Sequence, residues 1–259
     1  MDRLEEIAKN LDSKDKLSKF REKFILPEDK IYLDGNSLGV LAKDIIDGIN
    51  HTIKEEWGNN LISSWNKSWI KLPRMISQKL ASIIKSKKDE VYVGSSTSIN
   101  LFKLIKSILQ SNKSIKNIST DNLNFPSDKY ICELIAKDFN IDFNFLDYGS
   151  ELKADIEQLK EFIKEKRGII VLSHVAFKSS YRYPIKEISK FCKDNNTIVI
   201  WDLSHSIGAV DINMGLNQVD YAIGCTYKYL NGGPGSPAFI YVREQELRKL
   251  KSPIRGWFS

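Results

Sequence analysis

The sequence predicts an α/β fold in which a mostly parallel β-sheet carries helices on both faces. From residue 90 onward, short apolar segments typical of strands alternate with helical segments, which is the pattern of βαβ units. Two of the strand segments, residues 168–172 and 197–201, are apolar almost throughout rather than at every second position. Such strands are buried on both sides, as the inner strands of a parallel sheet are.

The individual elements follow from the spacing of apolar residues. Before the alternating part we expect helices at residues 4–24, 42–57 and 69–85, and a short strand at 31–33 that leads into a turn-rich loop. The later strands are expected at residues 90–93, 116–119, 143–146, 169–173, 197–201, 221–224 and 238–242. The helices between them are expected at residues 99–109, 128–138, 155–166 and 185–194. We expect an N-terminal helical segment with its loop at residues 1–60 and a larger domain at 61–259.

Composition and charge exclude several classes of protein. With 42% apolar and 28% charged residues, the chain has enough apolar surface to fold. The chain lacks both a long apolar run and an apolar leader after Met1, so neither a membrane span nor a secretory signal is expected. The net charge of +6 comes from lysines mixed with acids, which does not indicate a nucleic-acid partner. Three cysteines without CxxC spacing indicate a reduced, cytoplasmic protein with no metal site.

Polar residues follow several predicted strands, and in a parallel sheet ligands bind at the carboxyl ends of the strands. Asp202 comes directly after a buried strand, where a carboxylate needs a cation or strong hydrogen bonds. It also has the position of an ordinary helix N-cap. Lys228 follows another strand between aromatic residues, surroundings in which a lysine loses its charge and becomes a nucleophile. A lysine that extends along the surface is the alternative.

A third cluster, SSTS at residues 95–98, opens a predicted helix. Free N–H groups and the helix dipole at such a position favour a phosphate. A phosphate site, an acid able to pair with a pyridinium nitrogen and a lysine able to bind an aldehyde are what pyridoxal phosphate requires. The glycine-rich segment NGGPG at residues 231–235 follows the lysine, although an ordinary turn has the same composition.

Five ordered motifs resemble the kynureninase family, within the superfamily of aspartate-aminotransferase-like pyridoxal phosphate enzymes. They are YLDGNSLG at residues 32–39, NFPSD at 124–128, DLSHSIG at 202–208, YKYLN at 227–231 and GWF at 256–258. Related cysteine desulfurases usually have a histidine before the lysine, whereas this chain has Tyr227. The resemblance implies the large domain of a fold-type I, pyridoxal phosphate-dependent transferase-like enzyme.

The resemblance also implies a role for each matching residue. Lys228 would bind the cofactor covalently and move the α-proton of the substrate, while Asp202 would pair with the pyridinium nitrogen. Phe125 would stack on the ring, and Tyr227 would contact the phosphate and deliver a proton. The other cofactor-binding positions would be Thr97, Ser98, Pro126, Ser127, Asp128, Ser173, His205 and Trp257, the last from the second subunit of a homodimer. Trp65 would border the substrate ring.

The implied reaction is hydrolysis of the Cβ–Cγ bond of L-kynurenine, or of 3-hydroxykynurenine, in tryptophan degradation and NAD biosynthesis. The products would be L-alanine and anthranilate or 3-hydroxyanthranilate. Another enzyme of the superfamily, such as a cysteine desulfurase or an aminotransferase, remains an alternative, as does a non-catalytic cofactor-binding subunit. Family members continue into a C-terminal small domain that supplies an arginine for the substrate carboxylate. Because Ser259 is the last residue here, we expect that domain to be missing.

Overall fold

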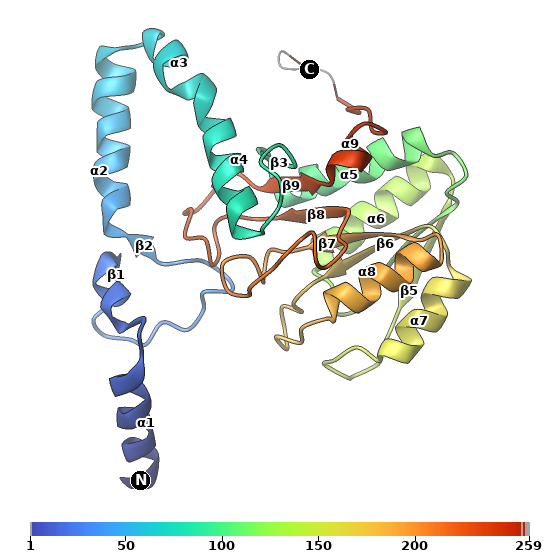
Figure 1. Ribbon diagram of the computed structural model, residues 1–259, viewed down its shortest axis with the longest axis horizontal. Coiled ribbons are helices and arrows are strands. Elements are labelled where there is room, and N and C mark those ends of the chain that lie inside the picture. Colours follow the sequence, from blue (N-terminus) through green and yellow to red (C-terminus); the bar gives the residue numbers. More distant parts are fainter. Residues whose placement is uncertain (1, 255, 257–259) are drawn as a thin grey trace.

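A twisted, mostly parallel sheet forms the centre of the molecule, as the sequence predicts. The computed structural model describes residues 2–254 and 256. The strands of the main sheet are β3 (Val91–Val93), β4 (Asn117–Asp121), β5 (Asp142–Leu146), β6 (Ile169–Ser173), β7 (Ile198–Asp202), β8 (Tyr221–Gly224) and β9 (Phe239–Val242). Their order is β3-β9-β8-β7-β6-β4-β5 (Figure 1). Only β9 runs antiparallel to its neighbours, β3 and β8.

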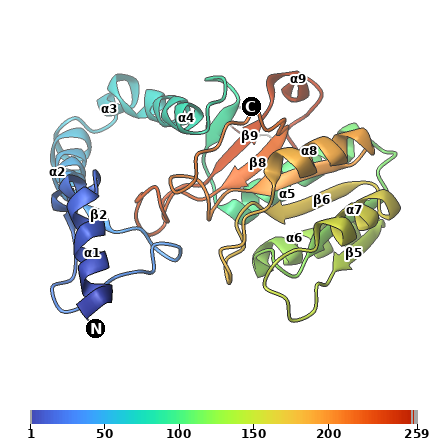
Figure 2. The same cartoon turned by 60° about the horizontal axis from the view of Figure 1, so that its bottom comes forward.

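Helices cover both faces of this sheet, and each face has its own apolar core. On one side lie α4 (Leu72–Ile83), α7 (Ile156–Glu165) and α8 (Ile185–Asp194), and on the other lie α5 (Thr97–Ser111) and α6 (Pro126–Phe139) (Figure 2). Strand β6 supplies both cores, because Ile170 and Leu172 face the first while Ile169 and Val171 face the second. This two-sided burial explains why the strand is apolar at successive positions. A short helix, α9 (Glu244–Leu247), follows β9.

The N-terminal part of the chain forms an arm that extends away from the sheet (Figure 1). It comprises α1 (Asp2–Lys14), η1 (Ser18–Lys23), β1 (Phe24–Ile25), β2 (Leu41–Ala42), α2 (Lys43–His51), the π-helix η2 (Thr52–Asn59), α3 (Ser63–Lys67) and η3 (Trp69–Lys71). Neither α2 nor η2 contains a buried residue. The domain boundary predicted after residue 60 stays a prediction. None of the described helices is both long and apolar enough to cross a membrane.

Three predictions for this arm are wrong in detail. The helix expected at residues 4–24 ends at Lys14, because the Asp15 side chain accepts a hydrogen bond from the backbone N–H of Leu17 at 2.8 Å and forms a turn. Residues 31–33 are not a strand and have no partner strand; the arm pairs β1 with β2 instead. The helix expected at 42–57 continues as the wider η2 after His51.

Candidate active site

A cavity of 270 Å³ lies where the carboxyl ends of β7 and β8 meet the N-termini of α5 and α6. It is lined by Ser95, Ser96, Thr97, Ser98, Phe125, Ser127, Asp128, Asp202, Ser204, His205, Tyr227, Lys228, Gly235, Ser236 and Ala238. These residues come from segments distant in sequence, and the parallel sheet brings them together. The cavity therefore occupies the place where α/β sheets bind their ligands.

Lys228 lies within this cavity wall and is not a surface lysine. It follows β8 and is only 6% exposed. Its Nζ contacts Nε2 of His205 and lies 5.4 Å from the centre of the Phe125 ring. Burial lowers the pKa of the Lys228 ammonium, which increases the share of the neutral, nucleophilic amine.

Two buried carboxyl groups, Asp202 and Asp128, line the same cavity. Oδ1 of Asp202 accepts hydrogen bonds from the backbone N–H and the hydroxyl of Ser204, at 2.8 and 2.6 Å. Burial raises the pKa of Asp202. Burial and the charge of Asp202 raise the pKa of Asp128 well above its ordinary value, and Oδ2 of Asp128 has no hydrogen-bond partner among the described residues. Two carboxyl groups beside a lysine with a lowered pKa can balance the charge of a further cationic group.

His205 lies one turn after Asp202 and stays neutral. Burial, with a smaller contribution from the nearby Lys228 charge, lowers its pKa to about 4. Its ring lies 6.1 Å from that of Phe125 and 6.4 Å from that of Phe177. Its Nδ1 is buried, and no residue in the described part of the chain forms a hydrogen bond with it. His205 and Phe125 thus give this part of the cavity a largely uncharged, aromatic wall, and the Phe177 ring packs next to both.

The opposite wall is formed by the N-terminus of α5 and suits a phosphate. Ser96 caps this helix through its side-chain oxygen, which accepts from the N–H of Ile99 at 3.4 Å. Thr97 and Ser98 form the first turn and place hydroxyl groups on the cavity wall. Tyr227 also lines it, and burial raises the pKa of its hydroxyl to about 12, so this group remains a donor.

The residues present therefore fit pyridoxal phosphate. A phosphate would meet hydroxyl groups at a helix N-terminus, a pyridinium N–H would meet the buried carboxyl group of Asp202, and an aldehyde would meet a buried amine. Ser173, one of the predicted cofactor-binding residues, is buried and is not among the residues that line the cavity; its hydroxyl donates to Oδ1 of Asn124 at 2.6 Å. Pro126 is the first residue of α6 and does not line the cavity either.

Other predicted residues have different outcomes. Trp257 lies outside the described residues. Trp65 lies on α3 in the N-terminal arm and is not among the residues that line the cavity. Ser204 and Ser236, which were not among the predicted site residues, also line the cavity. Ser204 belongs to the motif DLSHSIG, and its position just after a strand was the available signal. Ser236 directly follows the glycine-rich segment NGGPG.

The GNSLG loop, residues 35–39, packs against the segment that carries Lys228. The backbone N–H of Gly39 donates to the carbonyl oxygen of Tyr227 at 2.8 Å. A side chain at Gly39 would overlap the carbonyl oxygen of Lys228 and the side chain of Asn231. The close approach of these two backbones explains why this position holds glycine. The loop therefore supports the segment that carries the lysine.

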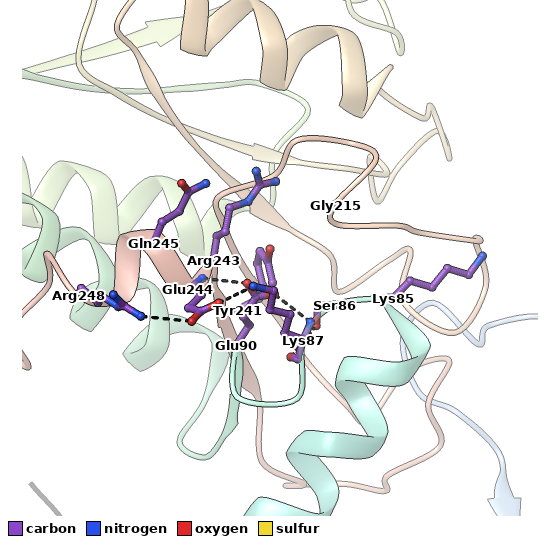
Figure 3. A pocket seen from close by; sticks show the side chains of 10 residues that line it. All are labelled: Lys85, Ser86, Lys87, Glu90, Gly215, Tyr241, Arg243, Glu244, Gln245 and Arg248. Atoms are coloured by element: carbon purple, nitrogen blue, oxygen red, sulfur yellow. Dashed lines mark hydrogen bonds and ion pairs between the residues drawn. The ribbon is translucent and has the colours of Figure 1, made fainter.

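A larger cavity of 920 Å³ lies near the start of β3 and α9 (Figure 3). Its basic side chains pair with carboxylates: Lys85 with Asp211, Lys87 and Arg248 with Glu244, and Arg243 with Asp220. Because these basic side chains already form ion pairs, this cavity has no counterpart of the buried amine of Lys228 among its described lining residues.

Comparison with known families agrees with this geometry. The family model described as aminotransferase class-V matches residues 31–256. The chain belongs to this family. Kynureninase from Pseudomonas fluorescens is 40% identical over 254 residues, which cover 96% of this chain and 60% of that protein. Kynureninase from Burkholderia mallei (strain SAVP1) is 38% identical over 260 residues, covering 98% of this chain and 61% of that protein. The chain thus spans about 60% of the length of these relatives.

Solved structures of more distant proteins share the fold. A cysteine desulfurase from Thermococcus onnurineus NA1 superposes with a TM-score of 0.77 at 20% identity, covering 92% of this chain and 59% of that one. A C-DES mutant with glycine covalently linked to its PLP cofactor gives a TM-score of 0.82 at 18% identity, covering 92% and 63%. At these identities the likeness concerns the fold alone. The resemblance to kynureninase predicted from the motifs is confirmed by the relatives of higher identity.

Proposed function

We propose that this chain forms the cofactor-binding part of a pyridoxal phosphate-dependent kynureninase. The reaction adds water across the Cβ–Cγ bond of L-kynurenine, or of its 3-hydroxy form, and gives anthranilate, or its 3-hydroxy form, and L-alanine. The observation that carries the proposal is the meeting of Lys228, Asp202 and the α5 N-terminus in one cavity of a class-V aminotransferase fold. Kynureninase relatives at 38–40% identity support the choice of reaction within that family.

Each residue has a definite task in this proposal. When bound, pyridoxal phosphate supplies an electron sink for a carbanion at the substrate α-carbon. Asp202 holds the proton on the pyridine nitrogen through its buried carboxylate. Lys228, whose pKa is lowered by burial, accepts the α-proton as a neutral amine. Phe125 restricts the ring plane from one side.

Tyr227 is the proposed proton donor. Burial raises its pKa to about 12, so its hydroxyl keeps its proton at neutral pH. Cleavage turns the γ-carbonyl of the substrate into the carboxyl group of anthranilate, with one oxygen from water. The β-carbon then needs a proton to become the methyl group of alanine. A donor on the cavity wall beside Lys228 can supply it.

We infer that the working enzyme is a homodimer in the cytoplasm. The arm exposes large apolar side chains, including Leu4, Leu11, Ile49, Trp57 and Ile62, and a surface of this kind is typical of an interface. Cys132, Cys192 and Cys225 are buried free thiols, as a reducing compartment permits.

The test is a turnover assay on the purified chain with added pyridoxal phosphate and L-kynurenine, followed by anthranilate fluorescence. Anthranilate from the parent chain, absent from Lys228→Ala and lowered about 100-fold in Tyr227→Phe, supports the proposal. Cofactor binding without anthranilate favours the non-catalytic subunit. Release of alanine from cysteine, but not from kynurenine, contradicts the proposed substrate and favours a desulfurase.

A further inference from the structure

A buried hydrogen-bonded network lies behind Phe125, at the end of β4 and in the turn into α6. It is built from Thr120, Asp121 and Asn124, whose exposed fractions are 0%, 2% and 5%. None of the three lines the cavity, and the proposed reaction gives none of them a task. Burying several polar side chains costs free energy unless each forms hydrogen bonds. Each of these three side chains does.

Asn124 is the centre of the network. Its Oδ1 accepts hydrogen bonds from the backbone N–H of Phe125 at 2.8 Å and from the hydroxyl of Ser173 at 2.6 Å. Its Nδ2 donates to Oγ1 of Thr120 at 2.9 Å and to the carbonyl oxygen of Val171 at 3.2 Å. One side-chain amide therefore links the turn by hydrogen bonds to β4 and β6, and it also binds the backbone N–H of Phe125.

Asp121 fixes the start of the same turn. Its Oδ1 accepts from the backbone N–H groups of Leu123 and Asn124, at 3.1 and 3.0 Å. Its Oδ2 accepts from the hydroxyl of Tyr183 at 2.6 Å. Together the two side chains determine the path of the backbone from the end of β4 to Phe125.

Phe125 needs this support because little else holds it. Its side chain is 38% exposed, and among the described residues its ring lies near those of Phe177 at 5.1 Å and His205 at 6.1 Å. The turn also sets α6, since the backbone N–H of Asp128 donates to the carbonyl oxygen of Phe125 at 3.0 Å. Two cavity residues, Phe125 and Asp128, therefore depend on one buried turn.

We propose that Asn124, supported by Thr120 and Asp121, is a positioning residue for the cofactor: it holds the turn so that the Phe125 ring and the Asp128 carboxyl group face the site. The proposal rests on the proposed function in that it requires pyridoxal phosphate to bind. Ligand sites depend on such supporting shells, because a misplaced wall group loses affinity without any loss of direct contacts.

The chain offers a matched control in Asn117, a buried asparagine at the opposite end of β4. Its Nδ2 donates to Ser119 and to the carbonyl oxygen of Lys166, at 2.8 and 2.7 Å, and its Oδ1 accepts from Asn144. Asn124→Ala and Asn117→Ala each remove a buried amide with comparable bonding. Both are expected to lower the melting temperature, so loss of stability alone does not distinguish them.

The deciding measurements are the dissociation constant of pyridoxal phosphate, from absorbance titration, and the visible circular dichroism per bound cofactor. We expect Asn124→Ala to weaken binding about tenfold and to reduce the dichroism, while Asn117→Ala keeps the parent values of both. Equal effects of the two variants, or a parent-like cofactor signal in Asn124→Ala, would overturn the proposal.

A milder pair decides the question if Asn124→Ala does not fold. Thr120→Val keeps the shape of the side chain but removes the acceptor for Asn124, and we expect about two- to fivefold weaker cofactor binding. Thr197→Val is its control, because the buried Thr197 hydroxyl forms no hydrogen bond within residues 2–254 and 256. Parent-like binding by Thr120→Val contradicts the inference alone, whereas failure of the folded parent chain to bind cofactor contradicts the proposed function.

Discussion

At the scale of single residues, the site contains groups whose pKa values are shifted from those in water. Lys228 has a lowered pKa and Asp202 and Asp128 have raised ones, and burial is the first cause of each shift. The sequence located Lys228 and Asp202 because each follows a buried strand. It could not separate cavity contacts from their supports: Ser173 also ends a strand, but its hydroxyl is used by Asn124.

The pH dependence of folding tests the buried Asp121. Burial raises its pKa from 3.8 to about 6, and no described cation forms an ion pair with it. Between these values the folded state binds a proton that the unfolded state has lost, so this residue makes the protein less stable as pH rises. We expect Asp121→Asn to gain melting temperature relative to the parent between pH 4 and pH 7.

The variant keeps an acceptor for the N–H groups of Leu123 and Asn124 but loses the acceptor for the Tyr183 hydroxyl. Loss of that bond lowers the melting temperature at every pH, so it is the change of the difference with pH that reports the charge of Asp121. A melting-temperature difference that is the same at both pH values would show that Asp121 does not titrate in this range.

At the scale of elements, prediction succeeded where burial determined the pattern. Strand β6 was predicted at its observed limits, and β7 within one residue, because both are apolar on both faces. The arm was predicted less well, because its residues are mostly exposed and its local turns are decided by single contacts, such as that of Asp15. Packing of the GNSLG loop on the lysine segment has no signature in apolar periodicity.

Gly39→Ala tests the packing of that loop. The added Cβ would overlap the Lys228 carbonyl oxygen, so the loop must move and we expect a cost of about 1–3 kcal/mol. Cofactor binding is expected to weaken with it, because the displaced segment carries Lys228. The measurements are the free energy of unfolding in urea and the dissociation constant of pyridoxal phosphate.

Gly48→Ala is the matched control, since a Cβ there meets nothing within 4 Å in the exposed helix α2. It should stabilise the chain by about 0.5–1 kcal/mol without changing cofactor affinity. A destabilising effect of both substitutions, or of neither, would contradict the assigned role of Gly39.

At the scale of the whole molecule, the sheet and its two cores contrast with the projecting arm (Figure 1). Within one chain, the described residues supply both the hydroxyl groups at the start of α5 and the lysine of the cavity. The arm instead presents apolar side chains to solvent, among them Ile49 at 54% and Trp57 at 65% exposed. A second copy of the chain is the proposed partner for this surface.

Ile49→Asp tests the proposed dimer. Because Ile49 lies on a helix without buried residues, we expect the substitution to leave the fold intact while weakening self-association about tenfold or more. Sedimentation equilibrium measures the change. Lys54→Asp, an exposed polar position on η2, is the control and should associate like the parent. Identical association of all three proteins would remove the arm from the interface.

The central claim is that pyridoxal phosphate binds covalently at Lys228 and not at one of the many surface lysines. The most direct measurement is borohydride reduction of the cofactor-loaded chain, followed by peptide mapping by mass spectrometry. We expect one equivalent of reduced cofactor on the peptide that contains Lys228, and loss of that adduct in Lys228→Ala. Labelling spread over exposed lysines, at the same level in parent and variant, would contradict the account.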